Sequence, residues 1–168
     1  THLITYVNIS KGEIAHFYNK PVSSPDIDQL SLNYFEFLSS HRMETWFNDP
    51  LVPEMIMNGE NIEAKFNNQR YDYFLNKMKL KRVILETVPH YLEVNIKAEP
   101  FSPEFNKKVK SYLSAVESYF RKNGWRDRLV FNSPIDEPNT MKDYEDTRLY
   151  AELVHEAFPG IPFLATES

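Results

Sequence analysis

The sequence has no cysteine and little glycine: none of its 168 residues is Cys and only 4 are Gly. The absence of cysteine excludes disulfide bonds, thiolate zinc sites and a thiol nucleophile. No apolar run approaches the roughly 18 residues that a membrane-spanning helix needs. The glycines form neither a G-x-G-x-x-G nor a G-x-x-x-x-G-K-[ST] motif, which disfavours nucleotide binding, and we expect no cofactor.

A surplus of basic residues is also missing. The formal net charge is -5 at pH 7, and the Lys and Arg residues are scattered along the chain. This pattern argues against nucleic acid and against an anionic membrane surface as partners. The 5 histidines show no H-E-x-x-H or other ligand spacing, so we expect no metal site.

Apolar residues are plentiful and make up 42% of the sequence. This content is enough for a hydrophobic core, and the length predicts one domain over residues 1–168 or a piece of a larger one. The 10 Tyr and 12 Phe residues are expected mostly in that core. The remaining rings are candidates for lining a site that takes a flat or ring-shaped ligand.

One stretch, Leu129-Val-Phe-Asn-Ser-Pro-Ile-Asp136-Glu137-Pro138, is an apolar run that ends in two adjacent carboxylates. An apolar run bounded by proline predicts a core strand, with the acid pair at its carboxyl end. Because consecutive strand residues point to opposite faces, Asp136 and Glu137 converge on one ligand only where the backbone turns. The flanking Pro134 and Pro138 favour such a turn. The alternative is a solvated acidic turn.

Hydrophobic spacing predicts alternating strands and helices along the rest of the chain. Ser102 and Pro103 are typical of a helix start, and Asn123-Gly124 of a left-handed helix stop. Residues 47–69 are expected to form a long irregular loop. Strands are expected over residues 3–9, 41–46, 81–88, 129–132 and 161–166, with a half-exposed arm over 91–96, and helices over residues 30–38, 71–78, 103–122 and 141–157.

Strands that alternate with helices are typical of an α/β fold with a parallel sheet of about five strands. Ligands of such sheets gather at the carboxyl ends of the strands. Polar or aromatic side chains at several strand ends look more like the rim of a barrel than a Rossmann crevice. The residues expected at these ends are Trp46, Glu86, Asp136, Glu137 and Glu167.

Several motifs together resemble the catalytic domain of glycoside hydrolase family 123. Shorter similarities at residues 38–42, 71–74 and 83–85 extend the resemblance over most of the chain from about Leu30. The resemblance implies a (β/α)8 barrel and an exo-acting N-acetyl-β-galactosaminidase. The motifs that carry it are Tyr112-Leu-Ser-Ala-Val, Lys122-Asn-Gly-Trp-Arg-Asp-Arg128, Asp136-Glu-Pro138 and Phe158-Pro-Gly-Ile-Pro-Phe-Leu-Ala-Thr166.

The resemblance also implies substrate-assisted chemistry with retention of configuration, in place of the usual two-carboxylate scheme. The 2-acetamido oxygen of the sugar would attack the anomeric carbon and form an oxazolinium ion. The family's Asp and Glu match Asp136, which would orient the acetamide, and Glu137, which would be the general acid and then the general base. One of two close carboxylates is expected to keep its proton to a higher pH.

The sequence departs from the family in length. A complete barrel takes about 250 residues and eight strands, so we expect an incomplete, partial (β/α)8 TIM-type barrel. Half a barrel leaves two open strand edges. The missing strands would come from a longer polypeptide, a partner segment or a second copy of the chain; otherwise the carbohydrate site is incomplete.

The other candidate residues have structural alternatives. Trp46 is a candidate for stacking on a sugar ring, yet an indole packed in the core or at the rim is an equal alternative. Glu86 and Glu167 are candidates for binding sugar hydroxyls, although structural ion pairs are as common at such positions. His41 and Arg42 are expected to have structural roles.

Two further functions stay open beside the acetamido-sugar hydrolase. An ordinary retaining glycosidase with Glu137 as acid/base would need a nucleophile on a later strand outside this chain. In such an enzyme the residue before the acid/base is expected to be Asn. Asp136 stands there instead, which favours the first hypothesis. The third hypothesis is a carbohydrate-binding or structural half-barrel without catalytic activity, which the short length supports.

Overall fold

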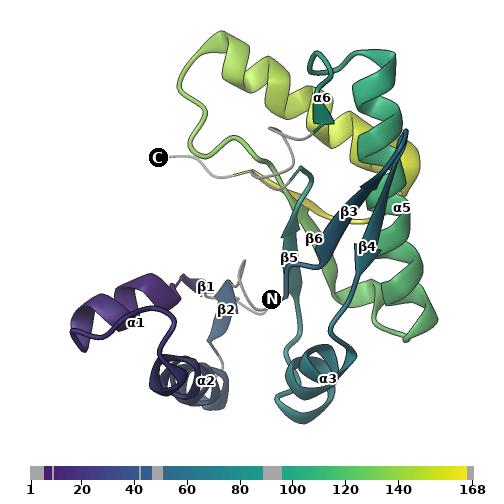
Figure 1. The fold of residues 1–168 in the computed structure, drawn as a ribbon. Helices are drawn as coiled ribbons and strands as arrows, with labels where there is room; N and C mark the ends of the chain where they lie inside the picture. Colours follow the sequence, from purple (N-terminus) through teal and green to yellow (C-terminus); the bar gives the residue numbers. More distant parts are fainter. Residues whose placement is uncertain (1–5, 9, 42, 47–50, 89–95, 166–168) are drawn as a thin grey trace. The chain divides into compact units, whose positions relative to one another are not determined.

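A computed structural model of the protein describes residues 6–8, 10–41, 43–46, 51–88 and 96–165 (Figure 1). The chain divides into two compact units, each described by itself below. Unit 1 comprises Thr1–Val52 and Asn67–Val83, and unit 2 comprises Pro53–Phe66 and Ile84–Ser168. The expectation of a single domain stays a prediction.

Unit 1 contains a parallel strand pair. Strand β1 (Tyr6–Asn8) pairs in parallel with β2 (Glu44–Trp46), in a register that sets Tyr6 opposite Glu44. The connection passes through helices α1 (Lys11–Phe17) and α2 (Pro25–Ser40). The strands predicted over residues 3–9 and 41–46 are thereby confirmed at Tyr6–Asn8 and Glu44–Trp46. The helix predicted over residues 30–38 is present but is longer, from Pro25 to Ser40.

Helix α1 was not predicted from the sequence. Ser10 accepts a hydrogen bond from the Glu13 backbone N–H at 3.1 Å, and the Glu13 carboxylate accepts one from the Ser10 backbone N–H at 2.8 Å. This reciprocal capping box satisfies two of the N–H groups that a helix start leaves unpaired. The helix buries Ile14 and Ala15 against Ile27 of α2.

The predicted helix around residues 71–78 is present but has two geometries. An α-helical turn, α3 (Asn68–Asp72), continues as a π-helix, η1 (Tyr73–Lys77). Phe74 is buried, and its ring centroid lies 6.0 Å from that of Phe35 on α2. The hydroxyl of the buried Tyr71 donates a hydrogen bond to the Leu51 carbonyl. Aromatic packing therefore joins this helix to α2 within unit 1.

Unit 2 is built on a three-stranded sheet in which β6 lies between β5 and β7. The chain is thus of the mixed α/β class, with a parallel sheet as predicted, and the described strands do not form a closed barrel. Helix α5 connects the first two strands and α6 the last two. The bounds are β5 Val83–Glu86, α5 Pro103–Lys122, β6 Leu129–Asn132, α6 Met141–Ala157 and β7 Phe163–Leu164.

Helix α5 has the predicted start, face and end. The Ser102 hydroxyl accepts a hydrogen bond from the Phe105 N–H at 3.2 Å, and Pro103 occupies the first turn. The helix ends beside Gly124, whose φ of 74° is the left-handed conformation that favours glycine. The buried residues that form its apolar face include Val109, Tyr112, Leu113, Val116 and Phe120.

The prediction of a long loop over residues 47–69 is wrong. Strands β3 (Glu54–Asn58) and β4 (Asn61–Lys65) form an antiparallel hairpin whose two-residue turn begins at Gly59, with φ of 60°. Gly59 at the first position of a two-residue turn is a local hairpin signal, although the hairpin was not predicted from the sequence. The strands are short and half-exposed, and their fold depends on packing along α5 (Figure 1).

The hairpin contacts α5 through polar and aromatic groups. The Ile62 N–H donates to the Ser111 hydroxyl at 2.8 Å, and the rings of Phe66 and Tyr119 stack with centroids 3.8 Å apart. The expected arm over residues 91–96 lies outside the described residues except for Ile96. The Ile96 carbonyl accepts a hydrogen bond from the Lys108 ammonium at 2.8 Å.

A buried ion pair joins α5 to the segment that leads into β6. The side chain of Glu117 is 4% exposed, and its carboxylate lies 2.9 Å from Arg126 Nε and 3.4 Å from Arg121 Nη2. Arg126 opens the short 3-10 helix η2 (Arg126–Arg128), which continues directly into β6. The pair therefore fixes the start of the central strand against the helix that precedes it.

We predict that Arg126→Met lowers the free energy of unfolding by about 3 kcal/mol, because it leaves a buried carboxylate without its main partner. The matched control is Arg121→Met, which removes the exposed partner of the same carboxylate and should cost no more than about 1 kcal/mol. Urea denaturation measures both. The double variant Glu117→Met/Arg126→Met should recover most of the loss, and equal effects of the two single variants would contradict this assignment.

Candidate functional site

The acid pair lies in the loop between the central strand and α6. All residues of β6 are buried, and the strand ends at Asn132, four positions before Asp136. The predicted buried strand with the acids beyond its carboxyl end is therefore confirmed. Both Asp136 and Glu137 are exposed.

The backbone turns at the acid pair. It bends from Pro134 through Glu137, and Glu137 itself has a φ of 49°. A non-glycine residue in this left-handed region is uncommon and costs on the order of 1 kcal/mol. Pro134 and Pro138 are buried on either side. Asp136 and Glu137 therefore do not lie in an extended strand, so the rule that consecutive side chains point to opposite faces does not apply to them.

Hydrogen bonds hold the loop near the strand end. The Ser133 N–H donates to the Leu164 carbonyl of β7 at 2.8 Å, and the Ser133 hydroxyl accepts from the Ile135 N–H at 3.1 Å. On the other side of the acids, Asn139 Nδ2 donates to the Glu137 carbonyl at 2.5 Å. The main chain on both sides of the acids is therefore hydrogen-bonded although their side chains are exposed.

A capping box at the start of α6 anchors the far end of the loop. The Asp143 carboxylate accepts hydrogen bonds from the backbone N–H groups of Thr140 at 2.9 Å and Asn139 at 3.2 Å. The Asp143 N–H donates to the Thr140 hydroxyl at 3.1 Å. Hydrogen bonding to Thr140, first to its side chain and then to its backbone, lowers the pKa of Asp143, and the Asn139 N–H adds to the shift.

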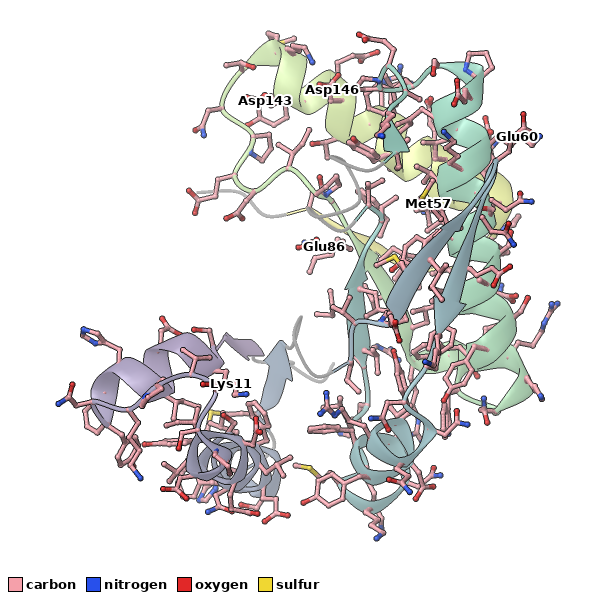
Figure 2. The ribbon with its side chains drawn as sticks, in the orientation of Figure 1. Lys11, Met57, Glu60, Glu86, Asp143 and Asp146 are labelled. Atoms are coloured by element: carbon pink, nitrogen blue, oxygen red, sulfur yellow. The ribbon has the colours of Figure 1, made fainter. Side chains whose placement is uncertain are left out.

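Glu86 lies at the same edge of the sheet as the acid loop. It is the last residue of β5 and is half-buried, and the next residue, Thr87, donates from its N–H to the Asn132 carbonyl at 3.0 Å. Parallel strands end together at one edge, so the ends of β5 and β6 are neighbours. Figure 2 shows Glu86 at the end of β5 and Asp143 in the first turn of α6. The predicted position of Glu86 at a strand end is confirmed.

Two other predicted site residues lie beyond what the structure describes. Trp46 ends β2 in unit 1, as expected, but its side chain is outside the described part. Glu167 is wholly outside it. Their roles as sugar contacts stay predictions.

Asn132, the residue at the strand end itself, was not predicted as a site residue. Asn132 is buried and ends β6, and its Oδ1 atom has no hydrogen-bond partner among the described residues. The signal was present, since a carboxamide closes an otherwise apolar strand immediately before a Ser-Pro turn.

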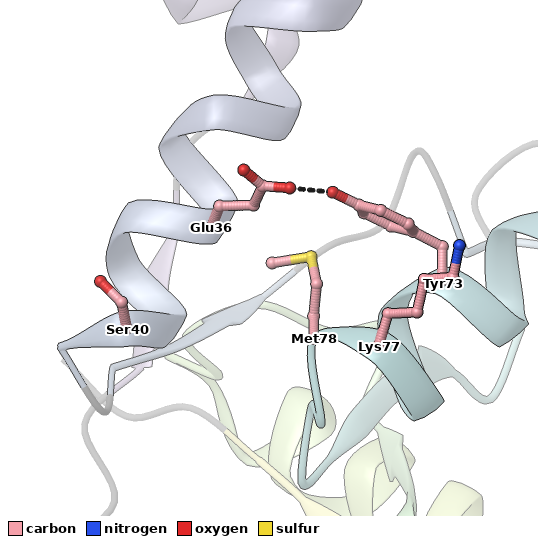
Figure 3. A pocket seen from close by; sticks show the side chains of 5 residues that line it. All are labelled: Glu36, Ser40, Tyr73, Lys77 and Met78. Atoms are coloured by element: carbon pink, nitrogen blue, oxygen red, sulfur yellow. Dashed lines mark hydrogen bonds between the residues drawn. The ribbon is translucent and has the colours of Figure 1, made fainter.

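A separate pocket lies within unit 1. Its volume is about 480 Å³, and the hydroxyl of Tyr73 on η1 donates a hydrogen bond to Glu36 on α2 across it (Figure 3). This bond to a carboxylate, together with partial burial, raises the pKa of Tyr73. The other described residues that line it are Ser40, Lys77 and Met78. The pocket offers one carboxylate, one ammonium group and hydroxyls, and the acid pair does not belong to it.

Neither a metal cluster nor a spanning helix is present in the described part of the chain. No group of three or more His, Asp or Glu side chains there is arranged to hold a metal ion. Among the same residues, no helix is long and apolar enough to cross a membrane. Comparison with protein-family models finds no matching family, and comparison with curated proteins finds no match.

The Asp143 cap should respond to acid in a defined direction. Because the folded pKa of Asp143 is lowered, the stability that its ionised form contributes is complete above the ordinary Asp pKa and is lost as pH falls through the lowered value. We predict that the amide resonances of Asn139 and Thr140 titrate together below the ordinary Asp range. An NMR titration of the folded protein measures this.

Thr140→Val should move that titration upward, since it removes the hydroxyl that lowers the pKa of Asp143. The control is Thr147→Val, the same substitution within α6, where the Thr147 hydroxyl has no hydrogen-bond partner among the described residues and so does not contact the Asp143 carboxylate. Unchanged titration in Thr140→Val would contradict the assigned cause.

Proposed function

We propose that the protein is a glycoside hydrolase that removes terminal N-acetyl-β-hexosamine residues, preferably N-acetylgalactosamine, by substrate-assisted catalysis with retention of configuration. The main support is the position of Asp136 and Glu137 in a bent, hydrogen-bonded loop at the carboxyl end of the central parallel strand. Ligands of α/β proteins bind at this edge of the sheet. The resemblance of the surrounding motifs to glycoside hydrolase family 123 adds the reaction class.

In the proposed first step, the acetamido oxygen of the sugar attacks the anomeric carbon while the bond to the leaving oxygen breaks. Glu137 gives its proton to that oxygen, and Asp136 accepts a hydrogen bond from the acetamide N–H. The positive charge that develops on the oxazolinium ring is stabilised by the Asp136 carboxylate. In the second step, Glu137 takes a proton from water, which attacks the anomeric carbon and restores the acetamide.

The strand-helix repeats are proposed to be those of a (β/α)8 barrel. Both parallel sheets have connections that pass through helices, which is the repeating unit of that fold. On this proposal the β3–β4 hairpin is an insertion within one strand-helix repeat, between strand β2 and the α3–η1 helix. Trp46, Glu86 and Glu167 are the proposed further contacts of the carbohydrate.

We predict that Glu137→Gln lowers kcat/KM for the phenyl N-acetyl-β-galactosaminide by about 10²- to 10⁴-fold, the usual contribution of a general acid. The loss should be much smaller for the dinitrophenyl glycoside, because its leaving group departs without a proton. Asp136→Asn should slow both substrates alike, since it acts on the acetamide. Release of the phenols, followed by absorbance, measures all four combinations.

The matched control is Glu156→Gln, which changes an exposed glutamate in the last turn of α6, at the other end of that helix from the acid loop, and should leave turnover unchanged. A trifluoroacetamido substrate should react more slowly with the unmodified protein because its carbonyl oxygen is a weaker nucleophile. Equal turnover of the plain galactoside would favour the ordinary retaining glycosidase. Absence of turnover with every glycoside would leave the non-catalytic carbohydrate-binding alternative.

A further inference from the structure

Asn132 is a buried polar residue with one side-chain acceptor atom that has no hydrogen-bond partner in the described part of the chain. The residue is 8% exposed, and its Oδ1 atom has no partner there. A buried acceptor that has lost water without gaining a donor destabilises the folded state. Nearly all such groups in proteins are paired, so an unpaired one calls for a specific explanation.

Two other buried side-chain atoms also lack a hydrogen-bond partner among the described residues, but they lie in a different part of the fold from Asn132 Oδ1. These are Asn106 Oδ1 on α5 and Thr147 Oγ1 on α6, both on half-buried residues of helices that flank the sheet. Asn132, in contrast, closes the central parallel strand at its carboxyl end. This is the edge at which α/β proteins bind ligands.

The backbone of Asn132 is fixed from two sides. Its carbonyl accepts hydrogen bonds from the Thr87 N–H at 3.0 Å and the Thr87 hydroxyl at 2.9 Å. On the other side, Asn132 is in register with Leu164 of β7. The carboxamide is therefore carried by a rigid strand, as a preorganised binding group should be.

We propose that Asn132 is a substrate-binding residue whose Oδ1 accepts a hydrogen bond from a ring hydroxyl of the sugar. This inference rests on the proposed glycosidase function. A hydroxyl donates to Oδ1 without bringing charge into a buried position. A neutral carboxamide also adds no third negative charge near Asp136 and Glu137, which follow it by four and five residues.

The test uses Asn132→Leu, which replaces the carboxamide with an apolar side chain of similar size. Removing an unpaired buried acceptor should leave the melting temperature unchanged or raise it. Affinity for N-acetylgalactosamine, measured by NMR titration of the whole chain, should fall about tenfold or more. Asn132→Ser, which is shorter but polar, should weaken binding in the same way and serves if the leucine variant does not fold.

Thr147→Val is the matched control because it removes another buried atom that has no partner among the described residues, on α6 and not on the central strand. It should keep or raise the melting temperature without changing the affinity. The 3-, 4- and 6-deoxy analogues of N-acetylgalactosamine then identify the hydroxyl. The analogue that lacks the contacted group should bind the Asn132 variants as well as the parent sugar does.

Separate outcomes overturn this inference and the proposed function. If the unmodified protein binds the sugar and Asn132→Leu or Asn132→Ser binds it equally well, the role of Asn132 is wrong and the function stands. A lower melting temperature with unchanged affinity makes Asn132 structural, which also overturns it. If the unmodified protein neither binds nor hydrolyses any N-acetylhexosaminide, the proposed function fails, and this inference fails with it.

Discussion

The site depends on the hydrogen bonding that holds β6 between β5 and β7. The Asn132 carbonyl takes two hydrogen bonds from Thr87 on one side, and the Ser133 N–H donates to the Leu164 carbonyl on the other. Because both neighbours run parallel to β6, they bring the ends of three strands to one edge. This strand pairing positions Glu86 and the acid loop at that edge of the sheet.

The acid loop combines exposed carboxylates with a fixed main chain. Glu137 adopts a φ of 49°, which an unrestrained glutamate rarely does. Ser133 at one end and the Asp143 cap at the other provide the hydrogen bonds that offset this conformational cost. Residues held in such conformations concentrate at functional sites, where the surrounding structure fixes them. The bend, rather than strand alternation, decides how neighbouring acids are presented.

Helix α5 supports the same strand from the opposite end. Its apolar face is buried, and its Glu117 is paired with Arg126 immediately before β6. The β3–β4 hairpin packs along this helix through Ile62 and the stacked Phe66 and Tyr119 rings. A hairpin of two short strands is marginal alone, so α5 provides the surface that makes it stable.

The sequence by itself determined the elements whose signals are local and repeated. The cap at Ser102, the 3.6-residue spacing of α5 and the buried run of β6 depend on neighbouring residues, so periodicity was enough to predict them. Gly59 marks the turn of the β3–β4 hairpin locally, but the two short strands depend on contacts with a helix about 50 residues later, which only tertiary structure provides. Tertiary structure also decided the π-helical turn at Tyr73. Tertiary structure also decided that Asn132 is buried and that its Oδ1 atom has no partner among the described residues. Whether a buried side chain finds a hydrogen-bond partner depends on groups that are distant in the sequence, and a local sequence pattern does not contain this information.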